Sequence, residues 1–171
     1  MEEIEIPTEH LHEAIHEKAE EAHNADKKEK RWSMYIVVST AFMAVFAAMS
    51  GLMAGHHSNE ALIEQIKASD NWAFYQAKGI KAEIKSLKNP EDPSIERYKK
   101  EQEEIKKDAD GEQQLSEYHL QKHIVLARAV TLFQIAIAIS AIAILTKKRF
   151  LWFISMGLTL VGLVFFITGL I

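Results

Sequence analysis

The sequence predicts an all-α membrane protein, with three transmembrane helices and a long antiparallel helical hairpin between the first and second. Three windows contain no Asp, Glu, Lys or Arg: residues 33–55, 129–146 and 150–171. The 44 charged residues of the 171-residue chain therefore all fall in the other 108 positions. Such segregation is typical of a chain that meets both lipid and water. It excludes an ordinary soluble fold and a nucleic-acid binder with a basic surface.

The first 32 residues are predicted to form an acidic, histidine-rich helix. Their opening, MEEIEIPTEH, has neither the basic region nor the apolar run of a secretory signal, so we expect the first apolar window to be an uncleaved anchor. His12 and His16 lie four residues apart and would share one helix face, where they are candidate ligands for a divalent metal ion. The alternative is a solvated helix in which these histidines are merely polar.

The three spans are expected at residues 33–55, 123–146 and 150–171. A helix of about 20 apolar residues crosses the hydrocarbon core of a bilayer. The second window reaches that length when His123–Ala127 join it and Arg128 extends toward the interface.

Basic clusters flank two of these spans and set the expected orientation. Lys27–Arg31 precede the first span, and Lys147–Arg149 form the short turn 147–149 between the second and third. Lys and Arg in short flanks stay on the cytoplasmic side. We therefore expect a cytoplasmic N-terminus, an extracytoplasmic segment 56–122 and an extracytoplasmic Ile171.

Segment 56–122 has the pattern of a coiled-coil hairpin. In its first arm, eight positions follow alternating spacings of three and four, and seven of them are apolar: Ile63, Ile66, Asp70, Ala73, Ala77, Ile80, Ile84 and Leu87. Residues 89–93 (NPEDP) stop the helix, and Asp92 can cap the next one with Pro93 at its first position. The second arm has a more polar seam at Ile95, Tyr98, Gln102, Ile105 and Ala109.

The seam of this hairpin is too polar to form a stable core by itself. We therefore expect the missing apolar contact to come from other copies of the chain or from a membrane protein partner. We expect four side chains to act as anchors for this contact: Trp72, Phe74, Tyr75 and Ile80. The alternative is that these residues line the hairpin's own seam. Small residues at Ala47, Gly51 and Gly55 would let spans approach closely, either between copies or within one chain.

Four histidines flank the predicted membrane boundary: His56, His57, His119 and His123. With the turn near Glu91, residue i should face residue 182 minus i, which brings His57 close to His123. Together the four are candidates for binding a metal ion or sensing pH. The alternative is that they cap helix ends and contact lipid headgroups.

Catalysis and cofactor binding are not expected. The sequence has no GxSxG, no HExxH and no glycine-rich phosphate loop. The spans carry no ionisable residue near their middle, which argues against a proton or ion pathway. The expected partners are the bilayer and a second copy or another membrane protein, with no nucleic acid.

Two stretches, EIPTEHLHEAIHEKAEEAH and GLMAGHHSNEALIEQIKASDNWAFYQAKGIKAEI, are similar to a bacterial family of small membrane proteins known only as a domain of unknown function. The resemblance covers most of the chain and is strongest in residues 3–23 and 51–84. It implies a span–hairpin–span layout and a bacterial inner-membrane location, and it implies no activity. The sequence thus predicts a non-enzymatic, oligomeric membrane scaffold, with a metal- or pH-responsive sensor as the alternative.

Overall fold

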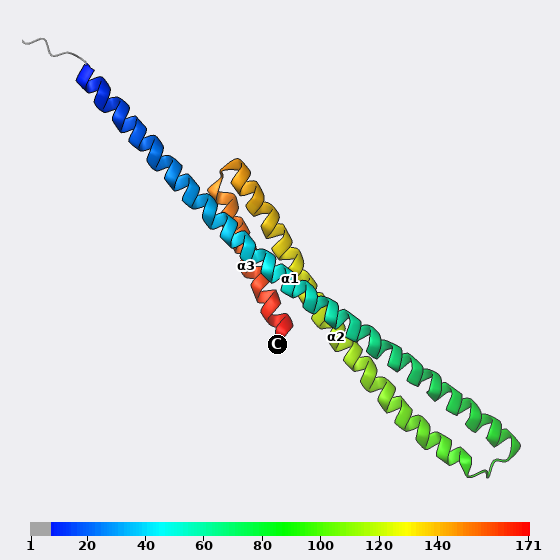
Figure 1. Ribbon diagram of the computed structural model, residues 1–171. Coiled ribbons are helices and arrows are strands. Elements are labelled where there is room, and N and C mark those ends of the chain that lie inside the picture. The colour runs from blue at the N-terminus through cyan, green and yellow to red at the C-terminus, as the bar shows by residue number, and fades with distance from the viewer. Residues whose placement is uncertain (1–7) are drawn as a thin grey trace, which may run out of the picture.

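The computed structural model consists of three helices: α1 (Thr8–Lys88), α2 (Ser94–Thr146) and α3 (Arg149–Leu170). It describes the backbone of residues 8–171 and the side chains of residues 27–171. Each helix contains a segment long and apolar enough to cross a membrane. Figure 1 shows α1 and α2 as an antiparallel pair that extends far beyond α3. The predicted all-helical fold with three potential spans is confirmed.

The first span and the first hairpin arm form one unbroken helix. Helix α1 has 81 residues, which corresponds to a length of about 120 Å at 1.5 Å per residue. Helix α2 likewise runs from the second hairpin arm into the second span without interruption, passing through Gly111. The arms of the hairpin are therefore rigid extensions of the spans.

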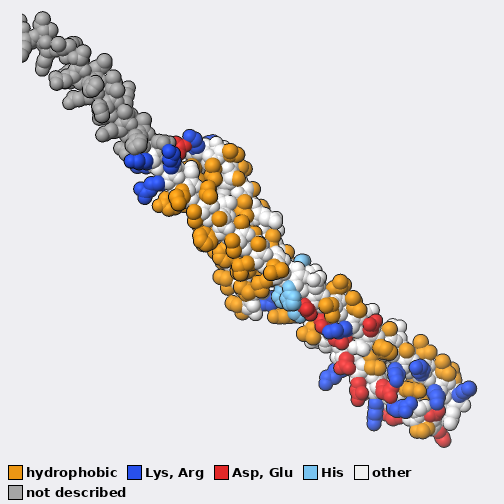
Figure 2. Space-filling model, in the orientation of Figure 1, with side chains coloured by type: hydrophobic (Ala, Val, Ile, Leu, Met, Phe, Trp, Pro, Cys, Tyr) orange, Lys and Arg blue, Asp and Glu red, His pale blue; other side chains and the backbone are white. Residues whose placement is uncertain are grey.

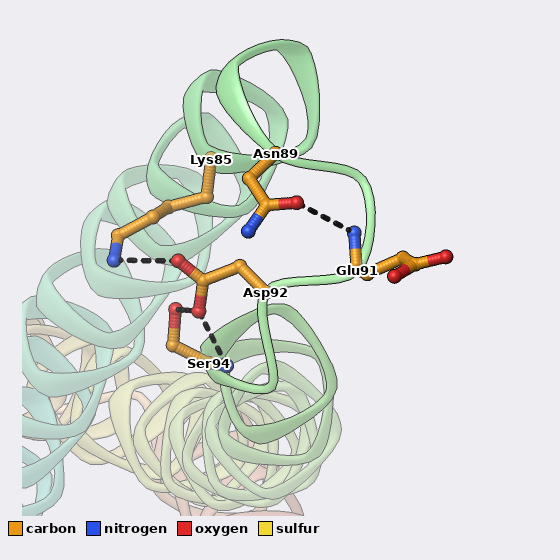
Figure 3. Close-up of polar contacts among 5 residues, drawn as sticks. All are labelled: Lys85, Asn89, Glu91, Asp92 and Ser94. Atoms are coloured by element: carbon orange, nitrogen blue, oxygen red, sulfur yellow. Dashed lines mark hydrogen bonds and ion pairs between the residues drawn. The ribbon is translucent and has the colours of Figure 1, made fainter.

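A compact set of hydrogen bonds closes the hairpin turn (Figure 3). The backbone N–H and the hydroxyl of Ser94 donate to Asp92 Oδ1 at 2.9 and 2.6 Å, and Lys85 Nζ donates to Asp92 Oδ2 at 3.0 Å. Pro93 already has helical backbone angles, so Asp92 caps α2 as the sequence predicted. Asn89 Oδ1 accepts the N–H of Glu91 at 3.3 Å.

Three side chains of α2 reach backbone carbonyls of α1 and define the register of the pair. His123 Nδ1 lies 2.9 Å from the carbonyl oxygen of Ala54. Ser116 Oγ donates to Ala61 at 2.8 Å, and Gln102 Nε2 donates to Tyr75 at 2.9 Å. In each pair the residue numbers add to 177, whereas the sequence analysis expected 182. The prediction was off by about one helical turn, because the end of α1 extends past the start of α2, so that Lys85 pairs with Asp92 of the turn.

The face of α1 that meets α2 is built largely from small residues, and we call it the alanine seam. Its positions recur every seven residues from 54 to 82. Tyr75 occupies one of them, and alanine occupies the other four: Ala54, Ala61, Ala68 and Ala82. All four are buried. The register places Ala68, 1% exposed, opposite Ala109, 0% exposed. A period of seven residues keeps one face of each helix against the other in a supercoiled pair.

Polar pairs alternate with the alanines along this seam. Asn71 Nδ2 donates to Glu112 at 2.9 Å, and Lys78 forms an ion pair with Glu101. The hydrogen bond from Lys78 holds the pKa of the Glu101 carboxyl below its ordinary value. These contacts satisfy polar groups that the close approach of the helices partly removes from water.

The seam predicted for the first arm was wrong, whereas that for the second arm was correct. All eight residues of the predicted first seam are exposed, while Ile95, Tyr98, Gln102, Ile105 and Ala109 are at least half-buried. Each of the eight lies two positions after a buried or half-buried residue of α1, which places it about 200° around the helix from that residue. The reason is that the buried span residues Ile36, Met43 and Ser50, also seven apart, fix which face of the continuous helix turns toward α2.

Helix α2 lies at the centre of the span bundle and packs against both α1 and α3. Two glycines of α3 allow this approach, because a Cβ on Gly162 would lie 3.0 Å from the Phe133 ring and one on Gly169 would lie 2.6 Å from Leu126. The buried hydroxyls of Ser140 and Ser155 lie 2.7 Å apart, and they tie α2 to α3. These close contacts fix how α2 and α3 pack against each other, and no charged side chain takes part in them.

We expect Ala68→Leu to destabilise the hairpin by about 1–3 kcal/mol, because a larger side chain overpacks the alanine seam. The control is Ser69→Leu, which adds the same side chain at the next residue, where the helix is exposed. Thermal unfolding in mild detergent, followed by circular dichroism, measures both. Equal stability of the two variants would contradict a close α1–α2 contact at this level.

We expect Asp92→Ala to fray the start of α2, seen as faster amide hydrogen exchange just after the turn. The bonds from Ser94 and Lys85 lower the Asp92 pKa to about 2. The stabilisation is therefore complete above the ordinary carboxyl pKa and is lost as the pH falls through about 2. Glu91→Ala removes the same charge without the cap and should leave exchange unchanged; an equal effect of both substitutions would refute the capping role.

Candidate functional site

The exposed apolar face of the hairpin is the first candidate site. We call it the outer stripe and define it as Ile63, Ile66, Asp70, Ala73, Ala77, Ile80, Ile84 and Leu87. Its large side chains are strongly exposed, from 45% at Ile63 to 87% at Leu87. Figure 2 shows hydrophobic side chains among the charged ones over this part of the molecule. A long apolar stripe that faces water marks an interaction surface.

The four predicted anchor residues divide between the two faces of α1. Phe74 and Ile80 are exposed, at 60% and 57%. Trp72 and Tyr75 are half-buried and pack edge to face, with ring centroids 5.5 Å apart. Tyr75 occupies an alanine-seam position and accepts the bond from Gln102. Phe74 and Ile80 are thus available to a partner, whereas Tyr75 belongs to the hairpin's own seam.

The small residues of the first span face different surroundings. Ala47 packs against the buried cluster that includes Phe133 of α2. A Cβ on Gly51 would lie 3.9 Å from Val130 of α2, and one on Gly55 would meet nothing within 4 Å in the described part of the chain. Ala47 and Gly51 therefore serve packing within the chain, and Gly55 lies open.

The histidines at the end of the spans form the second candidate site (Figure 2). His57 Nδ1 and His119 Nδ1 lie 2.9 Å apart, so one ring donates and the other accepts. We call these two residues the histidine pair. His123 instead donates to the Ala54 carbonyl, and the expected approach of His57 to His123 is replaced by the contact with His119. The shift of register by about one turn accounts for the exchange.

The surroundings of the histidine pair favour the neutral form of the His57 imidazole. Burial lowers the pKa of His57 below its ordinary value of 6.5, and the neighbouring His119, His56 and Lys122 lower it further, against an opposing effect of Glu60. A hydrogen bond between two Nδ1 atoms also requires that one of them carry no proton. The arrangement is therefore most stable when at least one of the two imidazoles is neutral.

The described histidines do not converge on a common point. Ring centroids of His56 and His57 lie 5.5 Å apart, and those of His57 and His119 lie 5.2 Å apart. Among residues 27–171, no group of three or more His, Asp or Glu side chains is arranged to hold a metal ion. His12 and His16, the other candidate ligands, have side chains outside the described residues. The geometry of residues 27–171 thus shows a two-histidine contact.

A signal for the alanine seam was present in the sequence. Alanines at positions 54, 61, 68 and 82 repeat with a period of seven, but the isoleucines of the outer stripe carry the stronger hydrophobic periodicity. The polar partners Glu112 and Ser116 were also missed, since polar residues do not contribute to that signal, whereas the predicted second-arm seam included Gln102.

These features define an all-helical protein with three potential membrane spans and a long hairpin that extends from two of them. The chain belongs to the family described as domain of unknown function (DUF4337), whose model matches residues 32–93 and 89–171. No curated protein and no solved structure matches the chain.

We expect His119→Gln to raise the His57 pKa toward 6.5, because the neighbouring ring is one cause of its lowering. The stability that the neutral pair provides is complete above the ordinary pKa of 6.5, and it is lost as the pH falls from there through the lowered value. Side-chain nitrogen shifts of the histidines, followed by NMR against pH in micelles, report this pKa. His123→Gln is the control, and an unchanged His57 titration in His119→Gln would contradict the coupling.

Proposed function

We propose that this protein is a non-enzymatic membrane scaffold that self-associates through the outer stripe of its hairpin. The observation that carries the proposal is that all eight positions of this heptad-spaced and mostly apolar face, which lies outside the apolar spans, are exposed. The hairpin's own seam uses alanines and polar pairs instead. The largest aliphatic side chains of the first arm thus remain for another molecule.

A second copy of the same chain fits this face. Copies inserted in one membrane with one topology stand parallel, with their outer stripes at the same height. Alternating spacings of three and four are what a parallel in-register coiled coil requires. In that arrangement the flanking positions place Glu83 of one copy near Lys88 of the next, and Gln76 near Lys81, so the flanks add no like-charge repulsion.

Asp70 interrupts the outer stripe and would restrain the association. A polar residue at one core position of a coiled coil costs stability and helps to set register. Asp70 separates the two isoleucines nearest the span from the large residues near the turn. The first group is Ile63 and Ile66, and the second is Ile80, Ile84 and Leu87. Such an interruption suits a contact that forms reversibly.

The proposed setting is a bacterial inner membrane with a cytoplasmic N-terminus and an extracytoplasmic hairpin and C-terminus. The basic clusters at Lys27–Arg31 and Lys147–Arg149 support this orientation, because both flank the same end of the spans. The hairpin then projects on the opposite side, where it can meet its copies or a partner.

A pH-responsive role is the second candidate, and the 2.9 Å contact of the histidine pair favours it. Protonation of both imidazoles would replace a hydrogen bond with repulsion at the point where the hairpin leaves the spans. Imidazole changes its charge within the physiological pH range. The response would then reach the outer stripe along the rigid α1 helix.

We expect Ile80→Cys to yield disulfide-linked dimers in oxidised native membranes, because the stripes of neighbouring copies meet at this level. The natural chain has no cysteine, so each variant carries a single thiol. Lys99→Cys, exposed on α2, is the matched control. Equal cross-linking of the two variants, or none above background, would overturn self-association through the stripe.

We expect Asp70→Ile to strengthen self-association, because it completes the apolar core of the contact. Sedimentation in mild detergent across a range of protein concentrations measures the shift toward oligomer. A variant that stays monomeric at every concentration would argue for a different protein on this face.

A further inference from the structure

A pocket opens at the basic end of the bundle, where all three potential spans finish. It has a volume of about 340 Å³ and is lined by residues of α1, the 147–148 turn and α3: Lys28, Glu29, Trp32, Lys147 and Arg149. Figure 2 shows Lys and Arg side chains gathered at this end of the apolar section. We call it the basic pocket. It lies far from the hairpin and is independent of the outer stripe.

The charge of the basic pocket is positive. Three cations, Lys28, Lys147 and Arg149, face one carboxylate, Glu29, which forms an ion pair with Lys147. The Arg149 guanidinium lies 5.9 Å from the centroid of the Trp32 ring. Among the described residues that line the pocket, three cations face one carboxylate, and this positive surplus suits an anion.

Two kinds of hydrogen-bond donor at the pocket, one side-chain N–H and several backbone N–H groups, lack an acceptor in the described part of the chain. The indole N–H of Trp32 is buried and unpaired. Helix α3 begins at Arg149 with no acidic residue in its first turn and no side-chain cap on its first N–H groups. Free N–H groups at a helix N-terminus attract anions. An oxyanion in the pocket would supply an acceptor for the first N–H groups of α3, whereas the indole N–H is fully covered.

Lys147 holds a backbone conformation that favours glycine. Its φ of 56° lies in the left-handed region, at the position where α2 ends and where glycine is the usual residue. A lysine here carries a conformational cost and places its charge at the pocket. Strain of this kind persists where the residue has another role.

The depth of the basic pocket matches the headgroup layer of a bilayer. Lys28 and Trp32 precede the apolar window that begins at residue 33, and Arg149 precedes the one that begins at residue 150. Five residues of helix rise about 8 Å, which is close to the thickness of one headgroup layer. Basic pockets between spans at this depth bind anionic headgroups.

We propose that the basic pocket binds the phosphate of an anionic phospholipid, held by Lys28, Arg149 and the N-terminus of α3. Inorganic phosphate has the same oxyanion chemistry but no acyl chains. A lipid would in addition lay its chains along the apolar surface of α1 and α3. The lipid would thereby join the ends of α1 and α3, which otherwise make few contacts with each other.

Native mass spectrometry of the full chain in neutral detergent tests this proposal, with phosphatidylglycerol and phosphatidylcholine as probes. We expect one retained phosphatidylglycerol per chain and little phosphatidylcholine. The variant Lys28→Gln/Arg149→Gln should weaken phosphatidylglycerol binding roughly tenfold or more. The matched control, Lys106→Gln/Lys107→Gln, removes the same charge from the exposed hairpin and should bind as the natural chain does.

A further arm separates the lipid from its phosphate. Excess inorganic phosphate should not displace the lipid. Equal binding by the pocket variant and its control, or displacement of the lipid by inorganic phosphate, would overturn the proposal.

Discussion

The close approach of α1 to α2 along the alanine seam determines the rest of this structure. Small side chains at Ala54 and Ala61 let side chains of α2 reach the backbone of α1, as His123 reaches Ala54 and Ser116 reaches Ala61. Wider residues at these two positions would hold the helices too far apart for such bonds. The single register that results brings His57 to His119 and turns the isoleucines of the first arm outward.

The seam runs from the apolar section into the charged hairpin. Ile36, Met43 and Ser50 are buried within the apolar section, and the same seven-residue interval leads through His57 to the polar pairs of the hairpin. Because α1 has no break, the rotation of the hairpin arm is fixed by the packing of the span.

The sequence predicted those features that depend on local chemistry. Charge-free windows marked the spans, and the Asn89–Pro93 segment with its Asp92 cap marked the turn. The register and the inner face of α1 depended instead on packing between distant segments. Alanine contributes little to hydrophobic periodicity, so the isoleucine pattern pointed to the face opposite the real seam. The sequence placed His119 within about a turn of His57 but brought His57 closest to His123, since a shift of one turn changes which rings meet.

Distances between spin labels on the two arms test the central claim of a register fixed by the alanine seam. One label is placed at Ser69, and the second at Glu103, Asp110 or Glu117, exposed residues seven apart on one side of α2. Because Ser69 and Asp110 each follow a member of the buried pair Ala68 and Ala109, the structure predicts the shortest distance for Asp110 and longer distances on both sides. Equal distances to Asp110 and Glu117 would indicate the register centred on Glu91 and would contradict the seam described here.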